Sequence, residues 1–191
     1  MRALFGHEVH YEFPQLWRTK GQTLAAFFES RPDDADWMGT RSCWQDARQV
    51  SVSGSRRQCG ICAACLLRRM SVHGAEGRED PAIYVWERLN ARFEEGAAEA
   101  FTNRRPKGAF HQYAIAGVLH LDHLSHLRRS PAGAAAIARQ AFLLTRPLRL
   151  DEQEAKKRLE DMLRQHEDEW RGFVDSLGPR SFVTPWTARG R

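Results

Sequence analysis

Three of the four cysteines of this chain lie within seven residues, and their spacing constrains the fold more than any other feature. They occur in the segment C-G-I-C-A-A-C, as Cys59, Cys62 and Cys65. On one ideal helix Cys62 and Cys65 share a face, whereas Cys59 points away from them. The three sulfurs therefore converge only if the first C-x-x-C is a turn, which Gly60 permits, and the second begins a helix.

The remaining cysteine, Cys43, lies upstream in T-R-S-C-W, and we expect a loop to bring it to the other three. Four thiolates in a closed tetrahedron form a structural zinc site, because no position is left open for water. His73 is an alternative fourth ligand in place of Cys43. An iron–sulfur cluster is a rival interpretation, since C-x-x-C-x-x-C also occurs in ferredoxins, but no further Cys-Pro follows at the expected spacing.

The sequence offers no signal for export or for a membrane. Its first residues contain no continuous apolar stretch of the kind found in signal peptides, and no apolar run is long enough to span a bilayer. We therefore expect a cytoplasmic protein without a membrane partner, whose thiols stay reduced rather than form disulfides. Ordinary buried thiols are the alternative to a metal site, but four of them converging on one segment is improbable by chance.

Apolar residues recur at helical spacing over much of the 191-residue chain, which predicts a mainly α fold. Helices are expected from Thr19 or Gly21 to Glu29, in the second C-x-x-C, at residues 81–93, and at about 109–129, 131–146 and 151–177. Gly96 can interrupt the third of these, and N-R-R-P-K-G at 103–108 ends it. Pro131 and Asp151 are the expected helix starts, and Pro147 the stop of the fifth helix. We expect an exposed, mobile loop at 49–57 and an extended tail after residue 179. Trp170 and Phe173 are predicted to lie in the core.

Three segments, F-P-Q-L-W-R-T-K-G-Q-T-L, S-C-W and C-G-I-C-A-A-C-L-L-R-R, occur in this order between about residues 12 and 70. Together they resemble the C-terminal part of the 7-cyano-7-deazaguanine synthase family. Those enzymes make the nitrile-bearing base of queuosine and archaeosine, and belong to the ATP-pyrophosphatase (PP-loop) group of α/β synthases. Divergent members in bacterial anti-phage gene clusters carry added segments, and this chain looks closer to those.

The resemblance implies roles for particular residues. It places the zinc ligands at all four cysteines, and the catalytic Lys and Arg of the family at Lys20 and Arg68. It implies a ligase that converts a carboxylate on a deazapurine to an amide and then a nitrile, using ATP and ammonia. The expected organisation is a zinc-binding synthase-like region at residues 1–75 and an added helical region at 76–191.

The chain also departs from the family. The loop Ser-Gly-Gly-x-Asp-Ser, which grips the nucleotide phosphates, is not present in the sequence, and S-V-S-G-S-R-R at 51–57 is a poor substitute. A phosphate cradle needs consecutive backbone donors at a helix start. The spacing from Cys43 to Cys59 also looks longer than is usual. ATP is therefore expected only through a longer chain or a nucleotide-binding partner protein, unless the activity has been lost. A homo-oligomer is the alternative to such a partner assembly.

A second hypothesis is a non-catalytic zinc module that binds nucleic acid or a partner protein. The net charge of +5 favours an anionic partner weakly. Arg56 and Arg57, beside the cysteines, are expected to face solvent rather than phosphate.

The segment H-L-D-H-L-S-H offers a possible second metal site at His120, His123 and His126. The H-E-x-x-H spacing of hydrolytic zinc helices is missing, so a polar stripe on an apolar helix is the favoured interpretation.

Overall fold

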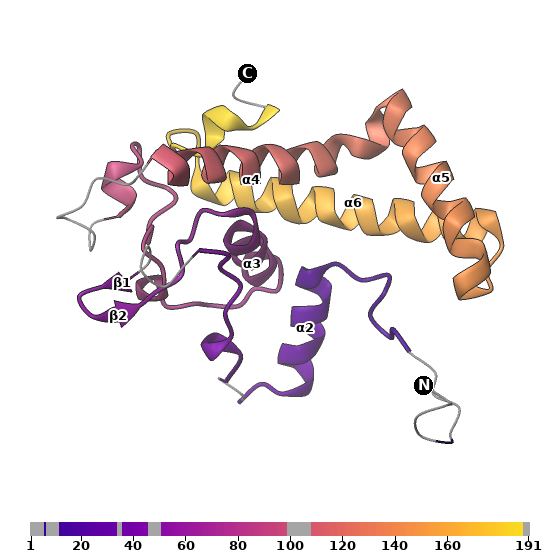
Figure 1. Cartoon of the computed structure of the whole chain (residues 1–191), viewed down its shortest axis with the longest axis horizontal. Coiled ribbons are helices and arrows are strands. Elements are labelled where there is room, and N and C mark those ends of the chain that lie inside the picture. Colours follow the sequence, from indigo (N-terminus) through magenta and orange to yellow (C-terminus); the bar gives the residue numbers. More distant parts are fainter. Residues whose placement is uncertain (1–5, 7–11, 34–35, 46–50, 99–107, 189–191) are drawn as a thin grey trace.

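The computed structural model describes residues 6, 12–33, 36–45, 51–98 and 108–188, and it confirms the mainly α fold. Five α-helices occur in this part of the chain: α2 (Lys20–Ser30), α3 (Ala63–Gly74), α4 (Gly108–His126), α5 (Pro131–Leu148) and α6 (Glu152–Leu177). Helices α4 and α6 lie side by side, α5 joins them at one end, and α3 and α2 pack below (Figure 1). None of the described helices combines the length and apolar character needed to cross a membrane.

The helix starts follow local sequence rules. Thr19 caps α2, with its side chain accepting from the Gln22 amide and the Gln22 side chain accepting from the Thr19 amide. Ser130 caps α5 directly before Pro131, and Asp151 caps α6 by accepting from the Glu154 amide at 2.8 Å. The expected stop at Pro147 is nearly right, because α5 continues one residue further, to Leu148.

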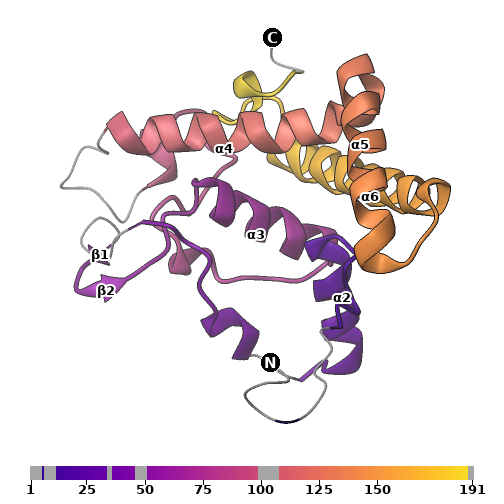
Figure 2. The same cartoon turned by 45° about the vertical axis from the view of Figure 1, so that its right-hand side comes forward.

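Helix α6 lies at the centre of the packing, since it contacts α3, α4 and α5 (Figure 2). The buried core contains residues from both the cysteine segment and the C-terminal helices, such as Leu66, Trp86, Val118 and Trp170. Trp170 and Phe173 are 3% and 4% exposed, as expected for core residues. The division at residue 75 stays a prediction, while the core itself is continuous across it.

The helix predicted at residues 81–93 is wrong. A single 3-10 turn, η2 (Pro81–Ile83), is followed by extended chain, although Asp80 does accept from the Ala82 amide as a cap. The extended residues bond to the chain before the first C-x-x-C: the Val85 amide donates to the Gln58 carbonyl at 2.8 Å. This long-range pairing satisfies the backbone groups that a helix would have satisfied locally, so the apolar periodicity was misleading.

Two other segments differ from expectation. Residues 51–56 form a short hairpin, β1 (Ser51–Val52) with β2 (Ser55–Arg56), while the predicted mobile stretch at 49–50 lies outside the described residues. Ser53 and Gly54 both have positive φ, which suits a two-residue hairpin turn. The tail is not simply extended, because Phe182 and Val183 are buried and a 3-10 turn, η6 (Thr184–Trp186), follows them.

Candidate metal centre

The four cysteine sulfurs lie within 4.8 Å of one another. Three of the four residues are buried, and the Cys59 and Cys65 sulfurs are 3.8 Å apart. A tetrahedron with zinc–sulfur bonds of 2.3 Å has an edge of about 3.8 Å. The cluster could therefore hold a metal ion such as zinc, with Cys43 supplied by a loop as the sequence predicted.

The local backbone brings the sulfurs together in the predicted way. Gly60 has φ +89°, and a Cβ at this position would lie 2.9 Å from the Trp86 carbonyl oxygen. Cys62 is the N-cap of α3, so the first C-x-x-C is a turn and the second begins the helix. Cys65, in the first turn of α3, then faces back towards Cys59, because the helix starts directly beside the turn.

Backbone amides surround the sulfurs as hydrogen-bond donors. The Cys59 and Gln45 amides donate to the Cys43 sulfur at 3.2 and 3.4 Å, and the Cys62 amide donates to the Cys59 sulfur at 3.3 Å. Such donors stabilise negative charge on sulfur and orient the ligand atoms. They favour a thiolate site held in a preformed loop.

Hydrogen bonds among the four sulfurs shift the pKa values of the cysteines in opposite directions. The bond to Cys59 lowers the pKa of Cys43 to about 6, and the same bond raises the pKa of Cys59. Bonds from Cys43 and the other sulfurs lower the pKa of Cys62, whereas they raise that of Cys65. Four thiols this close share protons. A bound metal ion would displace these protons and supply the positive charge between the sulfurs.

His73 is not part of this cluster, so its candidacy as fourth ligand is wrong. It lies in the last turn of α3, about two turns or roughly 12 Å along the helix from Cys65. Its ring packs edge-on against Phe173, with the ring centroids 6.0 Å apart. Cys43 occupies the fourth position because the loop before the hairpin passes directly over the turn of the first C-x-x-C, Cys59–Cys62, here called the knuckle.

The structure brings Lys20 and Arg68 to one cavity of about 300 Å³ between α2 and α3. Four apolar side chains contribute to its walls: Leu24, Phe27, Trp37 and Val72. The two residues are far apart in the sequence, and they meet because α2 packs against the same helix that begins at the knuckle. The cavity is thus an apolar slot with cations on its lining.

Arg68 is buried and uses its donors within the protein. Its Nε donates to Glu79 at 2.5 Å, and its Nη1 donates to the Thr40 carbonyl and hydroxyl oxygens at 2.6 and 2.7 Å. The Tyr84 hydroxyl donates to the other oxygen of Glu79, and burial followed by this bond raises the pKa of Tyr84. These contacts fix the loop before Cys43 to α3, which gives Arg68 a structural task whatever else it does.

Lys20 is placed differently. Its side chain is exposed at the rim of the cavity, and partial burial of the ammonium, then repulsion by Arg68, lowers its pKa. No hydrogen bond or ion pair of Lys20 occurs among the described residues. Of the two cations, Lys20 is therefore the one with donors available for a bound anion.

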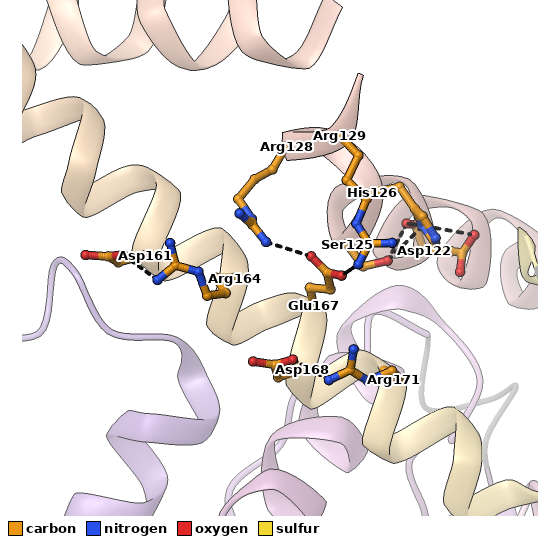
Figure 3. Close-up of polar contacts among 10 residues, drawn as sticks. All are labelled: Asp122, Ser125, His126, Arg128, Arg129, Asp161, Arg164, Glu167, Asp168 and Arg171. Carbon is orange, nitrogen blue, oxygen red and sulfur yellow. Dashed lines mark hydrogen bonds and ion pairs between the residues drawn. The ribbon is translucent and has the colours of Figure 1, made fainter. Parts of the chain in front are cut away.

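The histidine segment does not form a metal cluster in the described part of the chain. His120 and His123 are exposed, whereas His126 donates through Nδ1 to the Asp122 carbonyl at 2.8 Å (Figure 3). The Asp122 carboxylate instead accepts from the Trp170 indole at 3.0 Å and the Ala188 amide at 2.9 Å. Asp122 therefore joins α4 to α6 and to the C-terminal tail.

No known protein family, curated protein or solved structure matches this chain.

Sequence reasoning missed two residues that support the site. Arg69 donates to the carbonyls of Trp86 and Glu87, both at 2.6 Å, and its guanidinium lies 4.3 Å from the centre of the Tyr84 ring. Glu169 of α6 packs against the start of α2. The R-R pair after the knuckle was a visible signal for Arg69, whereas nothing local marked Glu169.

Proposed function

We propose that this chain is the zinc-binding, substrate-binding part of a deazaguanine synthase-like ATP-dependent ligase. The observation that carries the proposal is that Lys20 and Arg68, the two residues implied by the sequence resemblance, line one cavity beside a four-cysteine cluster. Zinc held by four thiolates is closed to substrate, so its role is structural. It stabilises the turn from which α3, and with it Arg68, projects.

The lining of the cavity suits a planar heteroaromatic acid. The cavity volume is at the lower end of the range for small-molecule pockets. Phe27 and Trp37 offer aromatic surface for a fused ring, and the Lys20 ammonium offers positive charge for a carboxylate. A cation in a partly desolvated site also stabilises the negative charge that develops when the carboxylate is activated and ammonia attacks.

ATP binding is assigned to a segment or partner outside this sequence. The sequence contains no PP-loop, and the starts of α2, α5 and α6 are capped by side chains rather than preceded by a glycine-rich loop. The open rim of the cavity, where Lys20 lies, is the side on which such a nucleotide-binding part would complete the site.

The proposal is tested by calorimetry of the zinc-loaded chain with deazaguanine 7-carboxylate and with 7-deazaguanine as the uncharged control. We expect the carboxylate to bind at least tenfold more tightly, because one hydrogen bond to a charged group in a partly buried site contributes about 1.5–3 kcal/mol. Lys20→Met should remove this preference, whereas Lys157→Met, on the exposed face of α6, should not.

The catalytic part of the proposal needs a second measurement. The chain is mixed with the products of its neighbouring genes, ATP, ammonia and deazaguanine 7-carboxylate, and AMP formation is followed. If neither carboxylate binding nor AMP formation that requires deazaguanine 7-carboxylate is observed, the ligase proposal is wrong.

A second proposal is favoured by one surface observation. Trp44, next to Cys43, is 73% exposed, and the neighbouring hairpin carries the exposed Arg56. An exposed aromatic ring with basic neighbours suits stacking on single-stranded nucleic acid. Salt-sensitive binding of a single-stranded RNA, lost in Trp44→Ala while the cavity ligand still binds, would support this proposal.

A further inference from the structure

Glu169 on α6 is a buried carboxylate without a cationic partner in the described part of the chain. The residue is 5% exposed. Its Oε1 accepts from the Thr19 hydroxyl at 2.5 Å and from the Gln165 side chain at 3.0 Å, whereas its buried Oε2 has no hydrogen-bond partner among the described residues. Burying a carboxylate in this way is costly unless some other positive potential offsets it.

The N-terminus of α2 supplies that potential. A Cβ placed on Gly21 would lie 2.6 to 2.8 Å from three atoms of the Glu169 carboxylate, so the carboxylate rests directly on the first turn of α2. The first amides of a helix lack intrahelical acceptors, and the helix dipole is positive at this end. Only glycine at position 21 leaves room for the carboxylate, which gives a physical reason for the Gly of T-K-G.

Glu169 also fixes the cap of α2. Because the Thr19 hydroxyl donates its single proton to Glu169, its lone pair is turned towards the Gln22 amide, which donates to it at 3.1 Å. The other side of the Glu169 side chain is confined by α3, since a Cβ on Gly74 would lie 3.1 Å from its Cγ. The carboxylate is thus wedged between the start of α2 and the end of α3.

Lys20 lies between the two α2 residues, Thr19 and Gly21, that Glu169 contacts. We propose that Glu169 is a positioning residue that holds the start of α2, and thereby keeps the Lys20 ammonium in the cavity beside Arg68. The C-terminal helical region is then part of the working site and not only an added segment. This inference rests on the proposed function in one respect, namely that Lys20 is the residue that meets the substrate.

Glu167, two residues earlier on α6, provides the matched control. It is similarly buried but accepts from Arg128 at 2.9 Å and from Arg129, and it faces the α4–α5 corner, away from α2 (Figure 3). Glu167→Met leaves two arginines without their partner and should lower the melting temperature. Glu169→Met leaves no cation unpaired, so its melting temperature should stay within about 4 °C of the parent.

The test measures acetylation of Lys20 by acetic anhydride across a pH series in the zinc-loaded full chain, with Lys157 as the internal reference. The accessibility of the amine sets the overall rate, whereas the pH midpoint depends on its surroundings, here the cavity wall, Arg68, Glu79 and Cys65. In the parent the midpoint of Lys20 should lie below the ordinary lysine pKa of about 10.4. A shift of half a pKa unit changes the neutral amine fraction about threefold, which peptide mass spectrometry resolves.

In Glu169→Met and in Gly21→Ala the Lys20 midpoint should move up to the ordinary lysine value, because the ammonium is released to solvent. Glu169→Gln, which keeps an oxygen acceptor for Thr19, should restore most of the parental profile, and Glu167→Met should not move it. An unchanged Lys20 profile in Glu169→Met overturns the inference. If the profile moves but deazaguanine 7-carboxylate never binds, the positioning role stands and the proposed function alone is wrong.

Discussion

In the knuckle region, residues 40–87, short elements are held by individual side-chain contacts, whereas in the helical region, α4 to α6, long helices are held by continuous packing. Several backbone carbonyls of the knuckle region accept from arginine side chains, such as Thr40 from Arg68 and Trp86 from Arg69. The helical region satisfies its backbone carbonyls within helices of 19, 18 and 26 residues. Loss of one contact should therefore matter more in the first region than in the second.

The two regions also neutralise buried charge differently. Glu79 is paired with one guanidinium, that of Arg68, and both side chains are less than a tenth exposed. Glu167 is paired with both Arg128 and Arg129, of which Arg129 is 61% exposed. A carboxylate with a single arginine partner is held in one position, whereas a carboxylate with two partners keeps an ion pair when one is lost. The candidate site lies in the knuckle region, where the single pair holds the geometry fixed.

The largest effect is expected from Cys62→Ser. In small zinc sites the free energy of metal binding contributes directly to folding, on the order of 10 kcal/mol in zinc peptides. We expect loss of tightly held zinc by elemental analysis and loss of hydrogen-exchange protection in α3, with part of the helical circular dichroism from α4–α6 retained. Ala64→Ser, in the same turn but not a ligand, should keep the metal. A Cys62→Ser protein that is metal-free at parental stability would refute the zinc site.

The next largest effect distinguishes the Arg68–Glu79 pair from the Arg128–Glu167 pair. Arg68→Met removes the ion-pair partner of the buried Glu79 carboxylate and should lower the free energy of unfolding by about 3–5 kcal/mol. Arg128→Met should cost about 1 kcal/mol, since Glu167 keeps Arg129. Urea unfolding midpoints measure both. Combining Arg68→Met with Glu79→Leu should recover much of the loss, and equal costs for the two single variants would contradict the proposed difference between the regions.

A smaller effect concerns acid stability of the helical region. Burial lowers the pKa of His166, whose Nε2 donates to the Leu121 carbonyl at 3.1 Å, with Glu169 and His120 as its charged or titratable neighbours. The unfolded chain then binds a proton more readily than the folded chain, so this contribution is present above the ordinary pKa of about 6.5 and is lost as pH falls below it. His166→Gln should flatten the pH dependence of the melting temperature between about pH 7 and 5. An unchanged slope would show that other groups dominate.

The smallest effect is expected at the start of α6. Asp151→Ala removes the acceptor for the Glu154 amide and should cost about 1 kcal/mol. Thermal unfolding measures the loss, and Asp151→Ser should restore most of it. If the loss equals that of Arg68→Met, the helical region is less tolerant than its continuous packing suggests.

Local signals explain what the sequence predicted correctly. The turn at Gly60, the helix that begins at Cys62 and the caps at Thr19 and Asp151 depend on residues within about four positions of one another, so spacing and residue type were sufficient. The helix expected at 81–93 failed for the opposite reason. Its apolar periodicity was real, but Tyr84, Val85 and Trp86 pair with a segment more than 25 residues earlier, and propensity carries no information about such pairing.

The sequence by itself determined that four sulfurs could meet and where most helices begin, because both are short-range properties of the backbone. Only the tertiary structure decided that Lys20 and Arg68 share a cavity, that Arg68 is committed to Glu79 and Thr40, and that Glu169 rests on the first turn of α2. These contacts join residues 11 to 150 positions apart. Which of them form depends on how α2, α3 and α6 pack, and packing is set by the whole buried core.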